Sequence, residues 1–508
     1  MIGRALGAIA FAVHMATIWR YGYFRDELYF IACSKHLAWS YVDQPPLVAF
    51  AAWLASPLGY ALPALRLLPA VAAALTVWLA CAMTRELGGG RFAQLLAGIS
   101  TLLLPAYLLL GNTLTTTSFE GFAWTLLVYL LLRLARGADS RLWLGAGAAA
   151  AFGLYGKYSM ALLLVALAIG IACTRERRIF TTWWFPAGLL LGGIAIAPSA
   201  AWQYAHGFPQ LAVLHGDYLH RHAFASGMQL ESQNVASNAV AFASEQLLYT
   251  NPIAVPIWLA GVAGLAFWKP LRSARFVAIA YAILLLIAAL TAAKGYYIIG
   301  IYASLLAAGS VAVERAVAAR PALRVAVLAA FAILTLPFVP LSLPVLPIDT
   351  FIAYSRVLGL TGRDATPPHL IQPVYAEEFG WEELTRRVAA VYAELPPKVR
   401  AHTGIFADTY ADASALNLYG ARYGLPAAIS GQNTYWLWGT GGYDGSSMIA
   451  VGATQQALLR GVFRRVKLVT TYGNPYKWIV EGPAPIFYCS DPIAPLDALW
   501  PRFKWYGA

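Results

Sequence analysis

Charged residues are scarce in this chain of 508 amino acids. Asp, Glu, Lys and Arg together make up 12% of the residues, whereas a soluble globular domain has about 25%. Hydrophobic residues make up 59%, against about 45–50% in soluble proteins. These two departures exclude a soluble globular protein and a disordered chain. They indicate a polytopic membrane protein.

Cysteines and acidic residues are also few. Four cysteines exclude a disulfide scaffold, and no spacing supports a bridge between Cys33 and Cys489. The chain has 36 Lys and Arg but only 24 Asp and Glu, which gives a net charge of +12. Residues 1–341 hold 22 of the basic and 11 of the acidic residues, a net of +11. These cations are dispersed between apolar runs, so they favour membrane topology signals over a nucleic-acid-binding patch.

Apolar runs follow one another along the first two thirds of the chain. Eleven occur, at residues 5–20, 62–84, 92–110, 119–134, 142–155, 158–173, 183–203, 248–268, 276–293, 296–313 and 323–341. A perpendicular span needs about 20 apolar residues. Several runs are shorter, so we expect bent helices or displaced boundaries. The first run lacks a small-residue cleavage site and is predicted to be an uncleaved span.

The basic residues select an orientation for these spans. With the N-terminus inside, the inner segments carry 15 Lys and Arg and the outer segments carry 7. The positive-inside rule therefore predicts a cytoplasmic N-terminus. We predict a transmembrane domain at residues 1–341, with outer loops at 21–61 and 205–247, and an extracytoplasmic domain at 342–508. We find no internal repeat, so the inverted-repeat architecture of many transporters is not supported.

The C-terminal domain has a different pattern. An amphipathic helical pattern at 381–388 is followed by short apolar runs at 404–407, 448–451 and 466–470. This combination predicts a small α/β domain. Residues 433–445 are rich in aromatic residues and glycine, which fits either a packed loop or a contact surface for carbohydrate or lipid.

Three acidic residues mark the first outer loop. Asp26 and Glu27 are adjacent, and neighbours on a helix point about 100° apart. We therefore expect one of them to face a cleft while the other fixes a neighbour such as Arg25, although a solvated pair is the simpler alternative. Asp43 or Gln44 is predicted to cap a helix that begins near Pro45. Such a helix start could also help to bind an anion.

Three further charges interrupt or flank apolar runs. Glu120 stands at the outer end of a span, where it is either a functional acid or a helix-start acid favoured by the helix dipole. Lys157, followed by Tyr158, lies in a short break between two runs, and Lys294 precedes Tyr296 and Tyr297. Both lysines fit either a cation that snorkels to an aromatic belt or a clamp for a lipid phosphate.

The second outer loop contributes the histidine-rich set of His206, His215, His220, Arg221 and His222. None of its spacings matches a metal motif such as His-Glu-x-x-His, so we predict no obligatory metal or other cofactor. A divalent metal is not supported by spacing. The acids and cations of these loops fall on one side of the predicted membrane, which suggests chemistry on a lipid-linked phosphate at the outer leaflet.

An ordered set of motifs resembles a known family. The segments are Arg25–Tyr29, Tyr41–Leu47, Thr116–Glu120, Lys157-Tyr158, Trp202–Pro209, Asn251-Pro252 and Lys294–Tyr297. In this order they resemble the bacterial protein-mannosyltransferase-like glycosyltransferases of the GT-C fold, which include the aminoarabinose transferase of lipid A. The C-terminal segments 408–410 and 429–433 look like uncharacterised bacterial members.

The resemblance implies an integral membrane enzyme of the bacterial inner membrane. It implies a polyprenyl-phosphate sugar as donor, inversion at the anomeric carbon, a lipid, glycan or protein acceptor, and contact with membrane lipids but not nucleic acid. The implied catalytic residues are Asp26, Glu27 and Glu120. The implied substrate-binding residues are Asp43, Gln44, Lys157, Tyr158, His206, Lys294 and Tyr297. Gln44 stands where the lipid A branch tends to have lysine, which argues against lipid A as acceptor.

Roles for these residues follow from the reaction. Polyprenyl phosphate is a good leaving group, so Lys157 and Lys294 are expected to stabilise its charge. A hydroxyl acceptor needs a base, for which we predict Asp26, with Glu120 orienting the acceptor or sharing that role; a phosphate acceptor needs none. A transporter or flippase of lipid-linked sugars would also explain the charges, but not the outer domain of 167 residues (342–508). A non-catalytic envelope assembly protein is a third alternative.

Overall fold

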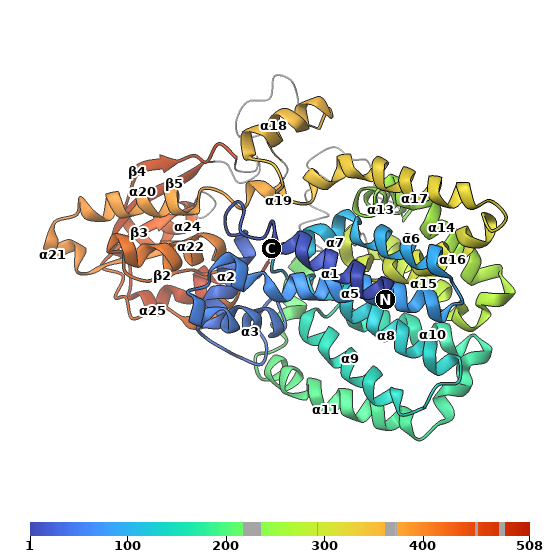
Figure 1. The fold of residues 1–508 in the computed structure, drawn as a ribbon. Helices are drawn as coiled ribbons and strands as arrows, with labels where there is room; N and C mark the ends of the chain where they lie inside the picture. The colour runs from blue at the N-terminus through green and yellow to red at the C-terminus, as the bar shows by residue number, and fades with distance from the viewer. Residues whose placement is uncertain are drawn as a thin grey trace.

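The structure is a computed structural model that describes residues 1–216, 235–291, 293–360, 371, 373–452, 456–476 and 483–507. Figure 1 shows two regions side by side, a large group of helices and a smaller group built around a sheet. The N-terminus lies among the helices of the large group. The two regions meet at helices α2 (Arg25–Ser34) and α3 (Leu47–Leu54).

Helices make up the larger region. They are α1 (Ile2–Met15), α4 (Leu62–Leu65), α5 (Leu67–Glu86), α6 (Arg91–Leu102), α7 (Pro105–Leu110), α8 (Glu120–Ala135), α9 (Leu142–Gly156), α10 (Met160–Ala172), α11 (Trp184–Ala205), α13 (Val235–Thr250), α14 (Val255–Phe267), α15 (Arg275–Thr291), α16 (Tyr302–Ala316) and α17 (Pro321–Thr335). The packed pairs include α1 with α5, α9 with α11, and α14 with α16.

Five continuous helical segments of the described chain are long and apolar enough to cross a membrane. They are Leu67–Glu86, Trp184–Ala205, Lys269–Thr291, Gly295–Ala316 and Pro321–Leu341, and a bent pair at Ala239–Thr250 and Pro252–Phe267 adds a sixth. The expected run 92–110 is divided into α6 and α7, because Pro105 cannot continue a helix. The number of eleven spans stays a prediction.

The smaller region confirms the predicted α/β architecture. Its five strands are β1 (Thr403–Ala407), β2 (Ala428–Ile429), β3 (Ser447–Val451), β4 (Phe463–Tyr472) and β5 (Ala484–Pro492), in the order β2-β1-β3-β5-β4. The pairs β1–β2 and β1–β3 are parallel, and the other two are antiparallel. The three apolar runs expected to be strands lie in β1, β3 and β4.

The C-terminal part of the chain also contains helices. They are α18 (Ile348–Val357), α19 (Pro373–Ala376), α20 (Trp381–Ala393), α21 (Pro397–Arg400), α22 (Tyr410–Tyr419), α23 (Asn433–Trp438), α24 (Gln456–Val462) and α25 (Leu496–Leu499). The helix predicted from the amphipathic pattern at 381–388 lies in α20. In the aromatic segment 433–445, Tyr435 is buried and the Trp438 ring stacks on His36 at 4.5 Å.

One hydrophobic core joins the two regions. It includes Tyr29 and Ala52 from α2 and α3 together with Leu384 and Ile405 from the sheet region. Helix α2 packs directly on α22. Because apolar side chains of both regions are buried in the same cluster, residues far apart in the sequence are fixed next to one another. The predicted domain boundary at 341 stays a prediction.

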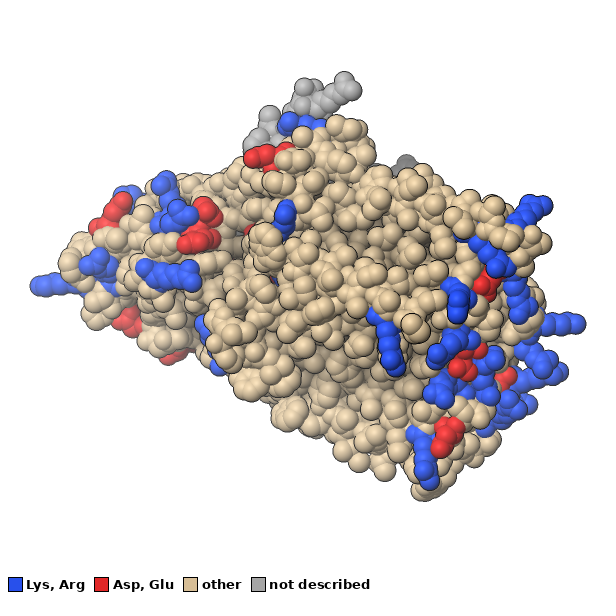
Figure 2. All heavy atoms as spheres, in the orientation of Figure 1, with Lys and Arg blue, Asp and Glu red and all other residues tan. Residues whose placement is uncertain are grey.

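The charges divide the surface into zones. In Figure 2, Lys and Arg gather at the end of the helical region that lies away from the sheet, and a broad uncharged zone separates them from the mixed charges of the sheet region. The basic end includes Arg136, Arg178, Lys269 and Arg272, which lie around one surface hollow. This distribution fits an apolar belt with a basic edge.

Candidate active site

A cavity of about 370 Å³ lies where the two regions meet. Outer-loop residues around α2 and α3 line one part of it, and the segments 157–162 and 294–297 line another. Tyr410 and Asn433 reach it from the C-terminal region. Seven of the predicted site residues line this cavity: Asp26, Asp43, Gln44, Lys157, Tyr158, Lys294 and Tyr297.

Two lysines and two tyrosines form what we call the cationic end of the cavity: Lys157, Lys294, Tyr296 and Tyr297. The backbone of Lys157 is extended, because α9 ends at Gly156 and the next helix begins only at Met160. The Lys157 ammonium lies 4.6 Å from the Tyr296 ring centre and 4.9 Å from that of Tyr297. These rings hold the cation by cation–π attraction without neutralising it.

Glu120 lies behind this end rather than in the cavity lining. It is the first residue of α8 and is 4% exposed. The Ser159 hydroxyl donates a hydrogen bond to its Oε1, and its Oε2 lies 3.9 Å from Lys157 Nζ. The Lys157 ammonium also donates to Thr117 Oγ1 at 2.8 Å. Glu120 therefore acts on the cavity through Lys157 and Ser159, both of which line it.

Asp26 lies in the first turn of α2 and lines the cavity. Its Oδ1 accepts a hydrogen bond from the Tyr410 hydroxyl at 2.8 Å and lies 3.5 Å from Arg25 Nε. Arg25 Nη2 in turn donates to the Tyr410 oxygen at 2.7 Å, and Arg25 Nη1 pairs with Glu377 at 3.0 Å. Among the described residues, Asp26 Oδ2 makes no hydrogen bond or ion pair, so that oxygen is available to a substrate.

Asp43 does not cap a helix, so that prediction is wrong. Helix α3 begins at Leu47 after Pro46, and no side chain caps it. Pro45 and Pro46 carry no N–H that Asp43 could accept. Its Oδ1 instead accepts from the Tyr29 hydroxyl and its Oδ2 from the Asn433 amide, both at 2.9 Å.

The surroundings of Asp43 shift its protonation. The pKa of Asp43 is raised to about 7, mainly by desolvation and in part by the nearby Asp26 charge, while the hydrogen bonds from Tyr29 and Asn433 oppose the rise. We call Asp26 and Asp43, with the Tyr410 and Asn433 side chains that bind them, the acidic end of the cavity. The two acids thus differ, because Asp43 has both oxygens engaged within the protein.

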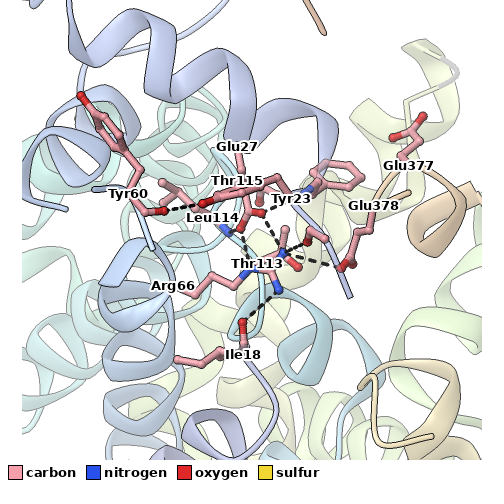
Figure 3. Close-up of polar contacts among 12 residues, drawn as sticks. Ile18, Tyr23, Glu27, Tyr60, Arg66, Thr113, Leu114, Thr115, Glu377 and Glu378 are labelled. Carbon is pink, nitrogen blue, oxygen red and sulfur yellow. Dashed lines mark hydrogen bonds and ion pairs between the residues drawn. The ribbon is translucent and has the colours of Figure 1, made fainter. Parts of the chain in front are cut away.

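Glu27 does not line the cavity, and its side chain points towards Arg66 and Leu114 (Figure 3). It is fully buried, and its oxygens accept from Arg66 Nε at 2.8 Å and Arg66 Nη2 at 2.7 Å. It also accepts from the backbone N–H groups of Phe24 and Leu114. As expected, one member of the Asp26–Glu27 pair faces the cavity and the other fixes a neighbour, but that neighbour is Arg66 rather than Arg25, since the helical turn directs Glu27 towards the interior. The geometry gives Glu27 a structural position, between α2, the junction of α4 and α5, and the loop at Leu114.

A third acid completes this buried cluster. Glu378, from the loop before α20, has its Oε2 at 3.6 Å from Arg66 Nη2 (Figure 3). Burial raises the pKa of Glu378 to about 8, and the Glu27 charge adds to this rise while Arg66 opposes it. One arginine thus lies between two carboxylates from different parts of the chain.

His206 lies outside the cavity. It is exposed, its ring stacks on Trp202 at 3.9 Å, and its Nδ1 is 2.8 Å from the Trp202 carbonyl oxygen. His215 is also exposed. His220, Arg221 and His222 lie outside the described residues. Within the described part of the chain, no group of three or more His, Cys, Asp or Glu side chains could hold a metal ion.

Tyr158 and Gln44 also line the cavity. The Tyr158 hydroxyl lies 2.9 Å from Ser40 Oγ and 3.2 Å from Ser199 Oγ. Gln44 is buried, and its Nε2 lies 3.5 Å from Cys33 Sγ. Cys33 is a free thiol, as are the other three cysteines.

Sequence reasoning did not identify the partners that come from the C-terminal region. Tyr410 and Asn433 were visible only as parts of the segments 408–410 and 429–433, which resembled family members of unknown role. Asn433 has a positive φ of 49°, a conformation in which asparagine is enriched among non-glycine residues. Nothing in the local sequence indicates that these side chains reach Asp26 and Asp43, which are 384 and 390 residues away.

Comparisons with known proteins agree with this architecture. Residues 43–202 match the sequence family described as dolichyl-phosphate-mannose-protein mannosyltransferase. The crystal structure of ArnT from Cupriavidus metallidurans bound to undecaprenyl phosphate has a TM-score of 0.61 at 14% identity, and covers 95% of this chain and 97% of that one. Its apo state gives a TM-score of 0.59 at the same identity and coverage. No curated protein sequence matches the chain.

The family match and the structural match support different parts of the chain. The family match includes Asp43, Gln44, Lys157 and Tyr158 of the cavity. The likeness to ArnT shows the fold over almost the whole chain, including the sheet region. With the ordered motifs, they confirm the predicted resemblance: residues 43–202 match the mannosyltransferase family, and almost the whole chain has the fold of ArnT.

Proposed function

We propose that the protein is an inverting glycosyltransferase that moves a sugar from a polyprenyl-phosphate donor to an acceptor outside the cytoplasm. The observation that carries this proposal is the division of one cavity into a cationic end and an acidic end. In glycosyl transfer from a phosphate, cations stabilise the phosphate leaving group, and a hydroxyl acceptor needs a base such as a carboxylate on the other side of the sugar. The ArnT structure that shares the fold was solved with undecaprenyl phosphate, which supports a donor of this kind.

The donor is assigned to the cationic end. Lys157 and Lys294 would bind the phosphate, and their charges would stabilise it as the bond to the sugar breaks. Tyr296 and Tyr297 keep the Lys157 ammonium over their rings, so the cation is already in place when the donor binds. Glu120 and Thr117 fix Lys157 from behind.

The acceptor is assigned to the acidic end. Asp26 would take the proton of an acceptor hydroxyl through its unengaged Oδ2. Attack from the side opposite to the phosphate inverts the anomeric carbon. Glu120 would assist through Lys157 and Ser159, whereas Glu27 holds the loop in place through Arg66.

Turnover by the purified protein tests this function. The full chain in lipid nanodiscs would receive undecaprenyl-phosphate-linked hexoses and pentoses carrying a radiolabel, together with envelope extract as the source of acceptor. We expect release of undecaprenyl phosphate and transfer of the label. Movement of intact donor across a proteoliposome bilayer without cleavage would instead favour a flippase.

The orientation is part of the proposal. The basic end of Figure 2 is placed in the cytoplasm and the sheet region outside it, which puts the cavity near the outer leaflet. A reporter that is active only outside the cytoplasm, fused after Ala508, should be active. Activity of a cytoplasmic reporter at the same position would contradict this orientation and the location of the site.

A further inference from the structure

The acidic end is built by two parts of the chain that are far apart in sequence. Asp26 and Asp43 come from the first outer loop, whereas Tyr410 and Asn433 begin α22 and α23 of the C-terminal region. Tyr410 donates to Asp26 and Asn433 donates to Asp43. In contrast, the cationic end contains only residues of the helical region.

These two contacts are firmly supported by their surroundings. The Tyr410 ring packs on Tyr29 with ring centres 4.5 Å apart, and its oxygen accepts from Arg25. Asn433 is 1% exposed, and its Oδ1 accepts from the Gly507 N–H at 3.1 Å. The Tyr410 side chain is therefore held by residues of α2, and the Asn433 side chain by the backbone of the C-terminal region. Their geometry does not depend on a ligand.

The charge at this end selects the class of acceptor. Among the described residues, Arg25 is shared by Asp26 and Glu377, so the acids here outnumber the cation. A second phosphate beside Asp26 and Asp43 would be repelled. A neutral hydroxyl group is instead attracted, because it can donate to a carboxylate oxygen.

We propose that Tyr410 and Asn433 are positioning residues that make the acidic end a subsite for an acceptor hydroxyl, so that the C-terminal region forms half of the acceptor site. This inference rests on the proposed glycosyltransferase function. It excludes a phosphate group as the nucleophile. It also gives the C-terminal region a direct part in transfer, in addition to covering the cavity.

The transfer step balances without a further reactant. The acceptor oxygen forms a bond to the anomeric carbon while the bond from that carbon to the phosphate oxygen breaks. The electron pair of the broken bond leaves with polyprenyl phosphate at the cationic end. The hydroxyl proton passes to Asp26 Oδ2, and Tyr410 keeps Oδ1 fixed so that Oδ2 faces the acceptor.

The chemical linkage in the product tests the class of acceptor. Label transferred to envelope extract would be separated from unused donor by chain hydrophobicity and then treated with mild acid. We expect the label to remain attached, as in an O-glycoside. Release of the label by mild acid would indicate a glycosyl phosphate and overturn the inference, while the proposed function would stand. If the wild type never cleaves the donor, the function itself fails and the inference falls with it.

Two variants test the positioning role. Tyr410→Phe keeps the ring and removes the donor to Asp26, and Asn433→Gly keeps the positive φ and removes the donor to Asp43. Losing a hydrogen bond to a charged group should lower transfer about tenfold in each case. We expect more extract to be needed for half-saturation, while undecaprenyl phosphate binds as in the wild type by native mass spectrometry. A merely structural role would weaken this donor-side binding as well.

Tyr423→Phe is the matched control for these variants. Tyr423 is in the same region, and its hydroxyl binds Glu382 at 2.6 Å, away from the cavity. We expect wild-type transfer from this control. Unchanged transfer in both Tyr410→Phe and Asn433→Gly would overturn the inference, as would equal losses of transfer and donor binding. The linkage experiment uses only the wild type, so it decides the acceptor class even if a variant fails to fold.

Discussion

The cationic and acidic ends of the cavity are built differently. Every residue of the cationic end comes from the helical region, at points where apolar segments are interrupted. The acidic end needs both regions, because its two carboxylates are bound by Tyr410 and Asn433. In the proposed function, donor recognition therefore belongs to the helical region alone, whereas acceptor recognition depends on both regions.

A second contrast separates the neighbours Asp26 and Glu27. Asp26 lines the cavity and keeps one oxygen unengaged, whereas Glu27 is fully buried in an ion pair with Arg66. We therefore propose that adjacent positions on α2 serve chemistry and stability, respectively. This follows from the helical turn of about 100° between neighbours.

The largest effect is expected from Asp26→Asn. The substitution keeps the shape of the side chain and removes the base, which should lower transfer about 100- to 10,000-fold. Undecaprenyl phosphate binding should stay close to that of the wild type, because Asp26 belongs to the acidic end. Single-turnover transfer and native mass spectrometry measure the two quantities.

Asp497→Asn provides the control for that substitution, since Asp497 binds Thr440 on the exposed surface. It should transfer sugar at the wild-type rate. Near-normal turnover of Asp26→Asn with an intact fold would show that another acid is the base. Glu120 would then be the next residue to replace.

Glu27→Gln should reduce stability rather than catalysis. Breaking a buried ion pair costs about 3–5 kcal/mol, and we expect the low end of this range because Glu378 stays near Arg66. The thermal midpoint in detergent should fall, while the protein that remains folded transfers sugar almost normally. Glu383→Gln is the matched control, because its pair with Arg386 is exposed and should contribute less than about 1 kcal/mol. A rate loss as large as that of Asp26→Asn would assign Glu27 to chemistry.

Lys157→Met and Lys294→Met test the cationic end. Each keeps a long side chain and removes a charge that the proposal places on the phosphate, so undecaprenyl phosphate should bind about tenfold more weakly. Lys269→Met, at the opposite basic end, should bind it normally. Unchanged affinity in both cavity variants would leave aromatic packing and snorkelling as the explanation of these lysines.

Features encoded by local pattern could be predicted from the sequence. The strands β1, β3 and β4 each follow from a short apolar run between polar segments. Lys157 and Lys294 could be identified because a charged side chain next to an apolar run is costly unless it has a partner or a function. These signals depend only on neighbours in the chain, which is why the sheet region and much of the cavity lining could be anticipated.

Features that depend on packing between distant segments could not be predicted. Arg66 lies within an apolar run, and its partners Glu27 and Glu378 come from two other parts of the chain. Asp43 looked like a helix cap because its local sequence permits one, and only the fold brings Asn433 to it. A carboxylate has many potential donors, and the tertiary structure decides among them.

The smallest expected effect concerns Glu378, at the junction of the two regions. Its pKa of about 8 in the folded protein lies above the ordinary value of 4.5. The folded state therefore keeps a proton that the unfolded state loses at a lower pH. The stability from this group is complete below about pH 4.5 and is lost as the pH rises to about 8. Glu378→Gln cannot ionise, so its thermal midpoint should fall less between pH 5 and pH 8. A difference of 1 kcal/mol corresponds to about 2–4 °C or less in a chain of this size. The control Glu383→Gln should keep the pH dependence of the wild type. If the thermal midpoints of the wild type and Glu378→Gln fall equally between pH 5 and pH 8, Glu378 is already ionised at the junction.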